Sequence, residues 1–434
     1  MSDYDYYLAQ FVDIHGRPKA KLVPGKHKEM IFTSGAGFAG FAIAGMGMDP
    51  HGAEFMAVGE RGNVRPVPWM PGTACVTCDG HVQGKPHPLD SRVIAKKALA
   101  AFKENTGMDF YTGLEPEFFL LCKNEQGGYV VATESESLDK PCYDFRHLSA
   151  VAPFLTELRA ALGEAGIDVY QIDHEDANGQ FEMNFTYAEG LATADNLTYF
   201  KMAAQAIARK HGMLCSFMPK PFAERSGSGL HMHMSAGAKP GENGFEDAKD
   251  SRGMSLSPLA YQFLAGLIAN APALTAIAAP SVNSYKRLVS RGSRSGATWA
   301  PVHIAYGDNN RTAFVRVPGG RLELRVPDSS ANPYLLTAAI IYAGLDGVRR
   351  KLDPGQPCNE NLYQLSAAEL ASRGIGRLPA SLPDALSQLE RSQVLCVGLG
   401  EAFVREFLEV KHAEVDELMM KISPAEFSRY VDFY

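Results

Sequence analysis

The sequence contains no run of lysine and arginine residues and no long stretch of large aliphatic ones. With a formal net charge of −7 and no basic patch, it lacks the usual signature of a nucleic-acid-binding protein. Residues 31–48 form the longest weakly polar stretch, and they contain too much Gly and Ala for a membrane span. The acidic residues 1–7 lack a basic region followed by an apolar one, so we expect no signal peptide. We therefore expect a cytoplasmic protein that binds neither membranes nor nucleic acids.

The sequence also gives only weak evidence for a cysteine-bound zinc site or for a dinucleotide-binding motif. The seven cysteines, an odd number, lie scattered in apolar contexts, as is usual in a reducing compartment. The CxxC motif at residues 75–78 has no second pair at zinc-ribbon spacing, which favours buried thiols over a zinc site. Residues 35–40 match GxGxxG, but no clear hydrophobic strand precedes them and residues 42–50 are too rich in Gly and Pro for a helix. We interpret this segment as a glycine-rich turn that can border an active site.

The chain does contain enough apolar sequence for a large core, at 46% of 434 residues, and enough length for two domains. Residues 1–89 favour short strands and turns, including a hairpin over residues 6–23. From Asp90 onward strands alternate with amphipathic helices, and Asp90 or Ser91 can cap the first of them. We expect helices over residues 90–105, 148–165, 194–211, 258–278 and 333–350, a surface loop over 237–253 and a helical tail over 380–423. The pattern predicts an α+β protein with a small β-rich domain, residues 1–89, and a larger domain, residues 90–434.

Three strand-like segments place polar residues two positions apart among apolar neighbours. They are Glu115-Pro116-Glu117, His231-Met232-His233-Met234 and Arg321-Leu322-Glu323-Leu324-Arg325. Because residues i and i+2 share one face of a strand, each segment directs its charged or ligating groups to one side. Carboxylates that share a buried face need cations to neutralise them. The three segments therefore predict a metal site with arginines beside it.

A fourth segment, residues 173–182, predicts two short strands joined by a turn at Asn178-Gly179, which would place Glu175 and Glu182 side by side. The candidate ligands are then five glutamates and one histidine: Glu115, Glu117, Glu175, Glu182, His231 and Glu323. Hard carboxylate oxygens with a single imidazole favour Mg²⁺ or Mn²⁺, and their number suits two ions. Any one of these glutamates, taken alone, also fits a surface ion pair. Their shared apolar strand context indicates a site of the kind that serves phosphoryl transfer.

Arginines accompany these carboxylates. Arg311, Arg316, Arg321 and Arg325 follow one another closely, and Arg287 precedes them. Guanidinium groups bind carboxylate and phosphate oxygens through paired hydrogen bonds. A single arginine is more often part of a structural ion pair, but together with the carboxylates these five describe an enzyme that holds a nucleoside triphosphate and an acidic substrate.

These motifs together resemble the glutamine synthetases, in the right order and over most of the chain. The matching segments are Glu115-Pro116-Glu117-Phe118 and residues 174–182, 217–235, 283–288 and 321–332. The resemblance implies an N-terminal β-grasp domain and a C-terminal catalytic domain with an antiparallel sheet flanked by helices. It also implies a dodecamer of two stacked hexameric rings, with active sites between neighbouring subunits and C-terminal tails that grip the opposite ring. The implied reaction phosphorylates the side chain of glutamate with ATP, and an amine then opens the γ-glutamyl phosphate.

The resemblance also implies a role for each matching residue. The first metal would be held by Glu117, Glu175 and Glu182, and the second, at the ATP phosphates, by Glu115, His231 and Glu323. Nucleotide contacts would come from His233, Ser235, Arg316 and Arg321. Glutamate would be held by Arg287, Arg325 and the backbone at Gly227. Catalytic residues would be Arg311, Arg316 and Glu182.

Two departures from the family pattern concern the amine. Ammonia-using members carry a flap, Pro-Gly-x-Glu-x-Pro, whose glutamate guards the intermediate and takes the ammonium proton. Here residues 288–301 form a longer loop with two arginines and Trp299 but no carboxylate. The family motif Gly-Phe-Asp-Gly-Ser-Ser supplies an aspartate for ammonium from the neighbouring subunit, whereas residues 37–42 here read Gly-Phe-Ala-Gly-Phe-Ala. Both anionic partners of ammonium are therefore missing.

The two losses favour a methylated amine. Phe41 and Trp299 add apolar surface, Tyr143 is a further candidate wall, and a buried methyl group contributes about 0.8 kcal/mol. The pattern resembles γ-glutamylmethylamide synthetases and the related type III-like branch, and it predicts methylamine as the substrate. The alternative is a glutamine synthetase that holds ammonia through other groups, such as Asp176 or Glu224. A third possibility is a ligase for another amine, such as ethylamine or a polyamine.

Tyr363 resembles a tyrosine that some bacterial glutamine synthetases adenylylate. Ser366 stands where their motif has proline, so we interpret Tyr363 as structural. A catalytically silent relative with a structural or regulatory role would be expected to lose metal ligands, and none is lost from this sequence.

Overall fold

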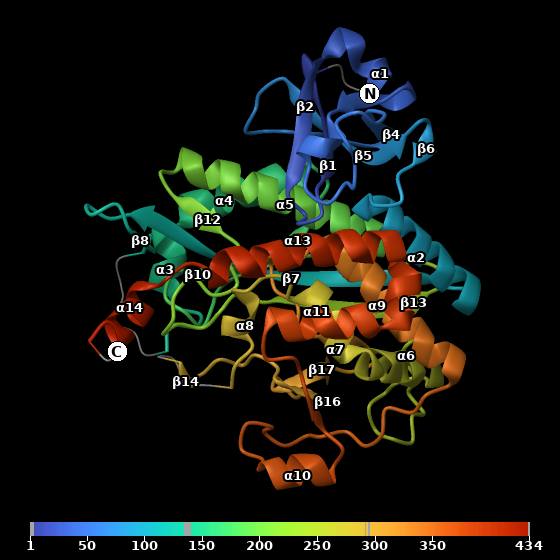
Figure 1. Ribbon diagram of the computed structural model, residues 1–434, viewed down its shortest axis with the longest axis vertical. Helices are drawn as coiled ribbons and strands as arrows, with labels where there is room; N and C mark the ends of the chain where they lie inside the picture. The colour runs from blue at the N-terminus through green and yellow to red at the C-terminus, as the bar shows by residue number, and fades with distance from the viewer. Residues whose placement is uncertain (1–3, 134–139, 291, 294–295, 433–434) are drawn as a thin grey trace.

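The computed structural model describes residues 4–133, 140–290, 292–293 and 296–432 (Figure 1). Its N-terminal part is a six-stranded sheet in the order β2-β1-β5-β4-β3, with β6 paired to β5. The strands are β1 (Tyr6–Val12), β2 (Pro18–Pro24), β3 (Ala36–Phe38), β4 (Phe55–Pro66), β5 (Thr73–Val82) and β6 (Lys85–Pro86), accompanied by the short helix α1 (Lys28–Thr33). β1 and β2 form the antiparallel hairpin that the sequence predicts, and β1 runs parallel to β5.

This smaller sheet has a hydrophobic core of its own. Phe11 packs against Phe38 and Phe55, with ring centroids 4.9 and 4.7 Å away. Residues 35–40 are not only the expected turn, because part of them forms edge strand β3 before the short 3₁₀ helix η2 (Gly40–Ala42). Cys75 and Cys78 are buried on β5, as the sequence predicts, and burial raises the pKa of the Cys75 thiol to about 12.

A second, eleven-stranded sheet forms the centre of the molecule. Its main order is β19-β16-β17-β18-β13-β7-β10-β9, and β8, β11 and β12 pair with the long strand β7. The strands are β7 (Asp109–Lys123), β8 (Tyr129–Val131), β9 (Val169–His174), β10 (Gln180–Phe185), β11 (Ala188–Glu189), β12 (Leu214–Ser216), β13 (Leu230–Gly237), β16 (His303–Asp308), β17 (Ala313–Val317), β18 (Leu322–Leu324) and β19 (Gly376–Arg377). Apart from the parallel pair β16 and β17, its ladders are antiparallel, as expected for the fold class.

Helices cover this sheet (Figure 1). They are α2 (Ser91–Thr106), α3 (Phe145–Ala150), α4 (Ala152–Glu164), α5 (Gly190–Lys210), α6 (Pro258–Ala269), α7 (Ala271–Ala278), α8 (Ser284–Arg287), α9 (Pro333–Arg350), α10 (Ala367–Ser372), α11 (Leu382–Arg391), α12 (Gln393–Leu399), α13 (Glu401–Met419) and α14 (Pro424–Tyr430). α2 begins where predicted, because Asp90 accepts the backbone N–H of Val93 at 2.9 Å and so caps it. The remaining strands, β14 (Gly292–Ser293) and β15 (Gly296–Ala297), form a separate two-stranded antiparallel sheet.

Two of the expected helices are each divided in two. Residues 258–278 form α6 and α7, which meet at a bend of 79°, and residues 148–165 divide between α3 and α4 at Val151. In both cases a proline, Pro272 or Pro153, is the second residue of the later helix, where its ring prevents continuation from the preceding turn. Among the described residues, no single helix is long and apolar enough to cross a membrane, and only the bent pair α6–α7 passes that test jointly, by length and composition.

A buried ion network joins the smaller sheet to the helices. Arg92 at the start of α2 donates to Asp79 on β5 at 2.6 Å and to Asp195 on α5 at 2.9 Å. A third carboxylate, Glu60 on β4, accepts from the same guanidinium at 2.9 Å. Arg92 and Asp195 are each 3% exposed in their side chains, so their charges are compensated within the protein rather than by water. The proposed boundary at residue 89 lies directly beside this network.

Candidate active site

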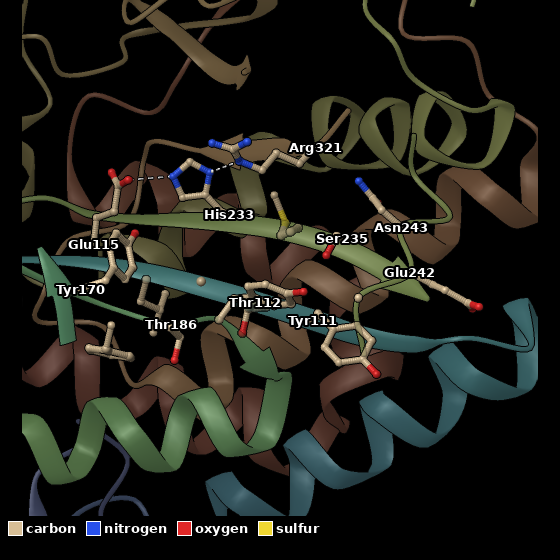
Figure 2. A pocket seen from close by; sticks show the side chains of 16 residues that line it. Tyr111, Thr112, Glu115, Tyr170, Thr186, His233, Ser235, Glu242, Asn243 and Arg321 are labelled. Atoms are coloured by element: carbon tan, nitrogen blue, oxygen red, sulfur yellow. Dashed lines mark hydrogen bonds and ion pairs between the residues drawn. The ribbon is translucent and has the colours of Figure 1, made fainter. Parts of the chain in front are cut away.

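The three period-two segments lie side by side, because β18, β13, β7 and β10 are consecutive strands of the larger sheet. Their registers pair His231 with Glu115 and Glu182 with Glu117 across the ladders. Figure 2 shows Glu115 and His233 pointing toward each other, with His233 Nε2 2.9 Å from the carboxylate. The prediction that these strands direct polar groups to one shared face is confirmed.

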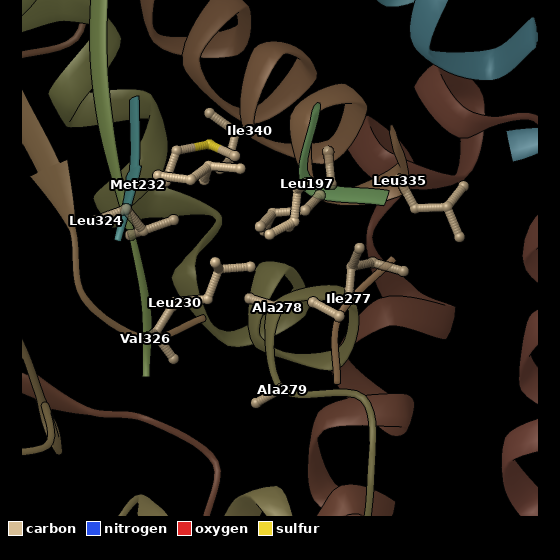
Figure 3. Close-up of a cluster of buried hydrophobic side chains, with 14 of the residues drawn as sticks. Leu197, Leu230, Met232, Ile277, Ala278, Ala279, Leu324, Val326, Leu335 and Ile340 are labelled. Carbon is tan, nitrogen blue, oxygen red and sulfur yellow. The ribbon is translucent and has the colours of Figure 1, made fainter. Parts of the chain in front are cut away.

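The opposite face of the same strands packs against the helices. Leu230, Met232 and Leu324 lie in the buried cluster of Figure 3 together with Leu335 and Ile340 of α9, and none is more than 1% exposed. Burying each such side chain contributes about 1.5–3 kcal/mol. A shift of one residue in register would bring charged side chains into this core, so the apolar face fixes the position of the polar one.

The polar face forms a wall of a cavity of about 510 Å³. Predicted metal ligands in its lining are Glu115, Glu117, Glu175, Glu182 and His231, and predicted phosphate or glutamate contacts are Gly227, Arg287, Arg311, Arg316 and Arg325. Glu323 is not among the lining residues and is 0% exposed. The structure therefore gathers residues from six separate segments of the chain around one cavity.

Glu115, His231 and Glu323 form one group whose potential ligand atoms all lie within 4.8 Å of one another. His231 Nδ1 is 3.3 Å from Glu115 and 3.9 Å from Glu323. Two carboxylates and one imidazole suit Mg²⁺ or Mn²⁺. These are the three residues that the sequence resemblance assigns to the second metal.

Glu117, Glu182 and His231 form another such group, so His231 borders both. Glu175, which was predicted here, is not part of it: Glu182 faces Asp173 across the β9–β10 ladder, and Glu175 follows the end of β9. Glu175 is nevertheless close enough to Glu117 for their charges to interact. Burial raises the pKa of Glu175 to about 8, and the charge of Glu117 contributes to the same shift. Burial and the charge of Glu175 likewise raise the pKa of Glu182 well above its ordinary value. Carboxylates that repel one another in a buried cavity fit a divalent cation, which their oxygens would hold.

Two amide side chains that were not predicted hold these glutamates. Gln180 donates to Glu117 at 2.8 Å, beside the backbone N–H of Gly229 at 2.9 Å. Asn184 donates to Glu182 at 2.8 Å. Gln180, Glu182 and Asn184 alternate along β10, so the period-two spacing that identified the other segments was also present here.

Glu323 is buried between two arginines. Arg316 donates to one carboxylate oxygen at 2.7 Å and Arg325 to the other at 2.5 Å. Burial alone would raise the pKa of Glu323, but the charge of Arg325, with those of the nearby histidines and Arg316, outweighs burial and lowers that pKa. Asn309 accepts from Arg316 Nε at 2.8 Å and so orients its guanidinium toward the cavity. Arg311 is exposed at the same cavity, and its carbonyl accepts from Arg325 Nε at 3.1 Å.

Arg287 lines the same cavity and is buried. Its guanidinium donates to the carbonyls of Val326 and Arg325 at 2.9 and 3.1 Å. A Cβ added to Gly227 would come within 2.9 Å of the Arg287 side chain, so only glycine allows this approach. The three residues predicted to hold glutamate, Gly227, Arg287 and Arg325, are thus brought together.

A second cavity, of about 380 Å³, adjoins the first and shares Glu115, Tyr170, His233 and Arg321 with it (Figure 2). Arg321 Nε donates to His233 Nδ1 at 3.2 Å. Ser235 lines this cavity as expected for a nucleotide contact, whereas Arg316 lines only the first. Its unpredicted aromatic walls are Tyr111, Tyr170, Phe185 and Tyr187. They come from separate strands and turns and share no motif.

Only some of the residues predicted to contact the amine line the first cavity. Tyr143 and Trp299 line the first cavity, and both have left-handed backbones, with φ of 64° and 50°. Left-handed aromatic residues are strained and concentrate at functional sites. Phe41 lies on η2, is 56% exposed and does not line the cavity of its own chain. Asp176 lines it, whereas Glu224 does not.

The sequence model of the glutamine synthetase catalytic domain matches residues 88–430. The chain belongs to the glutamine synthetase family. Among family members, the glutamate–methylamine ligase of Methyloversatilis universalis is 54% identical over 430 residues, which cover 99% of this chain and 96% of that relative. The glutamine synthetase of Rhizobium leguminosarum bv. phaseoli is 40% identical over 412 residues, 94% of this chain and 92% of the relative.

Solved structures of the family agree with the fold. A GmaS–ADP complex superposes with a TM-score of 0.92 at 41% identity, covering 99% of this chain and 97% of the other. A ligand-free GmaS gives a TM-score of 0.90 at 40% identity and the same coverage. The predicted glutamine synthetase family and its α+β fold class are confirmed.

Proposed function

We propose that this protein is an ATP-dependent ligase that joins methylamine to the γ-carboxylate of glutamate, giving γ-glutamylmethylamide, ADP and phosphate. The observation that carries the proposal is the amine side of the first cavity. Tyr143 and Trp299 line it, and residues 288–301 have no carboxylate where ammonia-using relatives carry their flap glutamate. The 54% identity to a protein named glutamate–methylamine ligase supports it, and the lower identity to glutamine synthetases supports the ammonia alternative less.

In the first step, the substrate carboxylate would attack the γ-phosphorus of ATP, and the bond to the bridging oxygen of ADP would break. Arg311 and Arg316 would neutralise charge on the phosphoryl oxygens, and Glu182 lines the same cavity as both arginines. Arg287, Arg325 and the backbone at Gly227 would hold glutamate. The two sets Glu115, His231, Glu323 and Glu117, Glu175, Glu182 would hold Mg²⁺ or Mn²⁺ ions, which supply charge neutralisation for phosphoryl transfer.

In the second step, the amine nitrogen would attack the γ-carbonyl carbon of the acyl phosphate, the bond from that carbon to the phosphate oxygen would break, and the leaving phosphate would take up the proton that the amine loses. Water competes with the amine for the same carbon. Trp299 and Tyr143 would reduce that competition by covering this side of the cavity, while a methyl group on the amine packs against their rings. ATP itself would occupy the second cavity, beside His233, Ser235 and Arg321.

The proposal includes the assembly and the place of action. In a dodecamer of two hexameric rings, Phe41 of one subunit would reach the cavity of its neighbour, which is consistent with its exposure on a single chain. The N-terminal domain, residues 1–89, would thus complete the site built by residues 90–434. All seven cysteines are free thiols, in keeping with action in the cytoplasm.

Ammonia remains the second candidate, because Asp176 is a carboxylate in the cavity wall that suits a small cation. Steady-state assays with methylamine, ammonia and ethylamine decide between them. Phosphate release measures the reaction rate, and mass spectrometry identifies the product. We expect kcat/KM for methylamine to exceed that for ammonia. A value for ammonia equal to or above that for methylamine would refute the proposal.

A further inference from the structure

Trp299 has a conformation that its own sequence does not favour. Its φ of 50° places a bulky side chain in the left-handed region, where the Cβ crowds the backbone. Such a residue persists only when contacts on both sides hold it. Thr298, before it, donates its hydroxyl to the carbonyl of Val289 at 2.6 Å. Ala300, after it, offers its carbonyl to the hydroxyl of Tyr363 at 2.5 Å.

Tyr363 contacts the chain on both sides of Trp299. Besides its bond to Ala300, its hydroxyl interacts with the side chain of Thr298. The ring is half-buried, and burial raises the pKa of Tyr363 to about 12, so the phenol remains a donor throughout the neutral range. One hydroxyl therefore secures the two residues that flank the strained tryptophan.

The segment that carries Tyr363 is itself firmly attached. Cys358 donates its N–H to the carbonyl of Tyr306 at 2.7 Å, and Asn310 donates to the carbonyl of Cys358 at 2.7 Å. Leu362, next to Tyr363, donates its N–H to Thr312 at 3.2 Å. Asn310 and Thr312 flank Arg311, so the same segment supports the phosphate side of the cavity as well as the tryptophan side.

The serine after this segment has a structural explanation. Ser366 caps α10: it accepts the N–H of Glu369 at 3.3 Å, and Glu369 accepts the N–H of Ser366 at 2.7 Å. This reciprocal capping starts a helix whose N-cap lies three residues after Tyr363, and it fixes the chain direction there. A tyrosine held at its hydroxyl and at the following helix is a structural element rather than a residue presented for modification.

We propose that Tyr363 is a positioning residue that holds Trp299 in its left-handed conformation and thereby fixes the cavity wall against which the amine substituent packs. The effect on the amine rests on the proposed function, but the effect on Trp299 does not. Tyr363 acts through Ala300 and Thr298 and does not need to touch the substrate.

The tryptophan itself provides the readout. The chain has two tryptophans, and Trp69→Phe leaves Trp299 as the single tryptophan, whose emission can be excited selectively over that of tyrosine, while keeping an aromatic ring against Tyr199. In that background we expect Tyr363→Phe to increase acrylamide quenching of Trp299 and shift its emission to longer wavelength. In the otherwise native enzyme we expect kcat/KM for methylamine to fall about five- to tenfold, as for one lost hydrogen bond, with KM for ATP and glutamate unchanged. The value for ammonia should stay within about twofold.

Tyr306→Phe is the matched control, because Tyr306 also donates its hydroxyl to a backbone carbonyl, that of Gly355 at 2.7 Å, in the same region. It should leave both the Trp299 fluorescence and the amine preference unchanged. In a Trp299→Phe background, Tyr363→Phe should produce little further loss of amine preference. Unchanged fluorescence in Tyr363→Phe, or an equal change in Tyr306→Phe, overturns the proposal. A native enzyme that prefers ammonia refutes the proposed function, while the fluorescence comparison still tests Tyr363.

Discussion

Glu115 and His231 face each other across the β7–β13 ladder, with His231 Nδ1 3.3 Å from the carboxylate. His231 also lies 3.9 Å from Glu117, which belongs to the other group of candidate ligands. One imidazole therefore borders both proposed ion positions. Its replacement should disturb both, whereas replacing a glutamate on one side should mainly disturb one.

We expect His231→Ala to weaken Mn²⁺ binding by at least about tenfold, because the imidazole is the single nitrogen donor among carboxylates that otherwise repel one another. Isothermal titration calorimetry of Mn²⁺ against the purified protein measures this directly, without ATP turnover. His412→Asn, on the exposed side of α13, is the control and should bind Mn²⁺ as the native chain does. Native Mn²⁺ affinity in His231→Ala would rule out the proposed ligand set.

The left-handed backbone at Tyr143 predicts that replacing this residue with glycine raises the stability of the fold but weakens the preference for methylamine. Tyr143→Gly should stabilise the fold by about 1 kcal/mol, because glycine adopts a φ of 64° without steric cost. The backbone N–H of residue 143, which donates to the carbonyl of His174 at 2.9 Å, is kept. Loss of the ring should lower kcat/KM for methylamine by about fourfold, the value of one buried methyl group, and leave ammonia unaffected.

Lys351 provides the control for Tyr143. It has a similar φ of 52° at the C-terminus of α9 and lies outside both cavities of the site. Lys351→Gly should raise the melting temperature as Tyr143→Gly does, with no change in amine kinetics. A selective loss of methylamine activity in Lys351→Gly would show that backbone relaxation, not the Tyr143 ring, sets the preference.

Local patterns predicted the features of this protein that depend on neighbouring residues. The hairpin of β1 and β2, the cap of α2 by Asp90 and the extent of α9 all follow from turn, cap and periodicity signals within a few residues. The alternation in β7, β13 and β18 likewise predicted one polar face. The divisions after Val151 and Asn270 were missed although Pro153 and Pro272 marked them.

Features that depend on contacts between distant parts of the chain could not be predicted from local sequence patterns. The position of Glu175 past the end of β9 depends on the β9–β10 register, which pairs Glu182 with Asp173. The aromatic wall of the second cavity gathers Tyr111 and Tyr170 from different strands, so no sequence motif unites it. The tie between Tyr363 and Ala300 spans 63 positions and became visible only in the folded chain.

Asp90 predicts a pH dependence of stability. Burial raises the pKa of Asp90 to about 7, against an ordinary value near 3.9 in the unfolded chain. Between about pH 4 and pH 7 the folded protein therefore holds a proton that the unfolded chain has lost, and this stabilisation disappears as the pH rises through 7. Asn is an equally good cap and stays neutral. The stability of Asp90→Asn relative to the native chain should thus increase with pH, by about 1.4 kcal/mol per unit within this window.

Thermal melts of Asp90→Asn and the native chain at several pH values test this. Asp144 supplies the contrasting variant, because it caps α3 in the same manner, by accepting the N–H of Arg146 at 2.9 Å, but lies at the surface. The hydrogen bond from the Arg146 side chain lowers the pKa of Asp144, so Asp144→Asn should not gain on the native chain as the pH rises. A pH-independent difference between Asp90→Asn and the native chain would contradict the protonated state assigned to Asp90.

The Arg92 ion network predicts how much stability is lost when the contact between the smaller sheet and the helices is weakened. Arg92→Met keeps much of the side-chain volume but leaves Asp195 and Asp79 without their shared cation in a site where Asp195 is 3% exposed. Breaking a buried ion pair by removing one partner costs about 3–5 kcal/mol. We expect a large fall in melting temperature, with the smaller sheet losing protection from amide hydrogen exchange first.

Arg61→Met is the control. It removes a surface ion pair with Glu29 and should change neither the melting temperature nor the exchange protection appreciably, because water screens those charges. An Arg92→Met variant as stable as Arg61→Met would show that the network contributes nothing to joining the two parts of the chain.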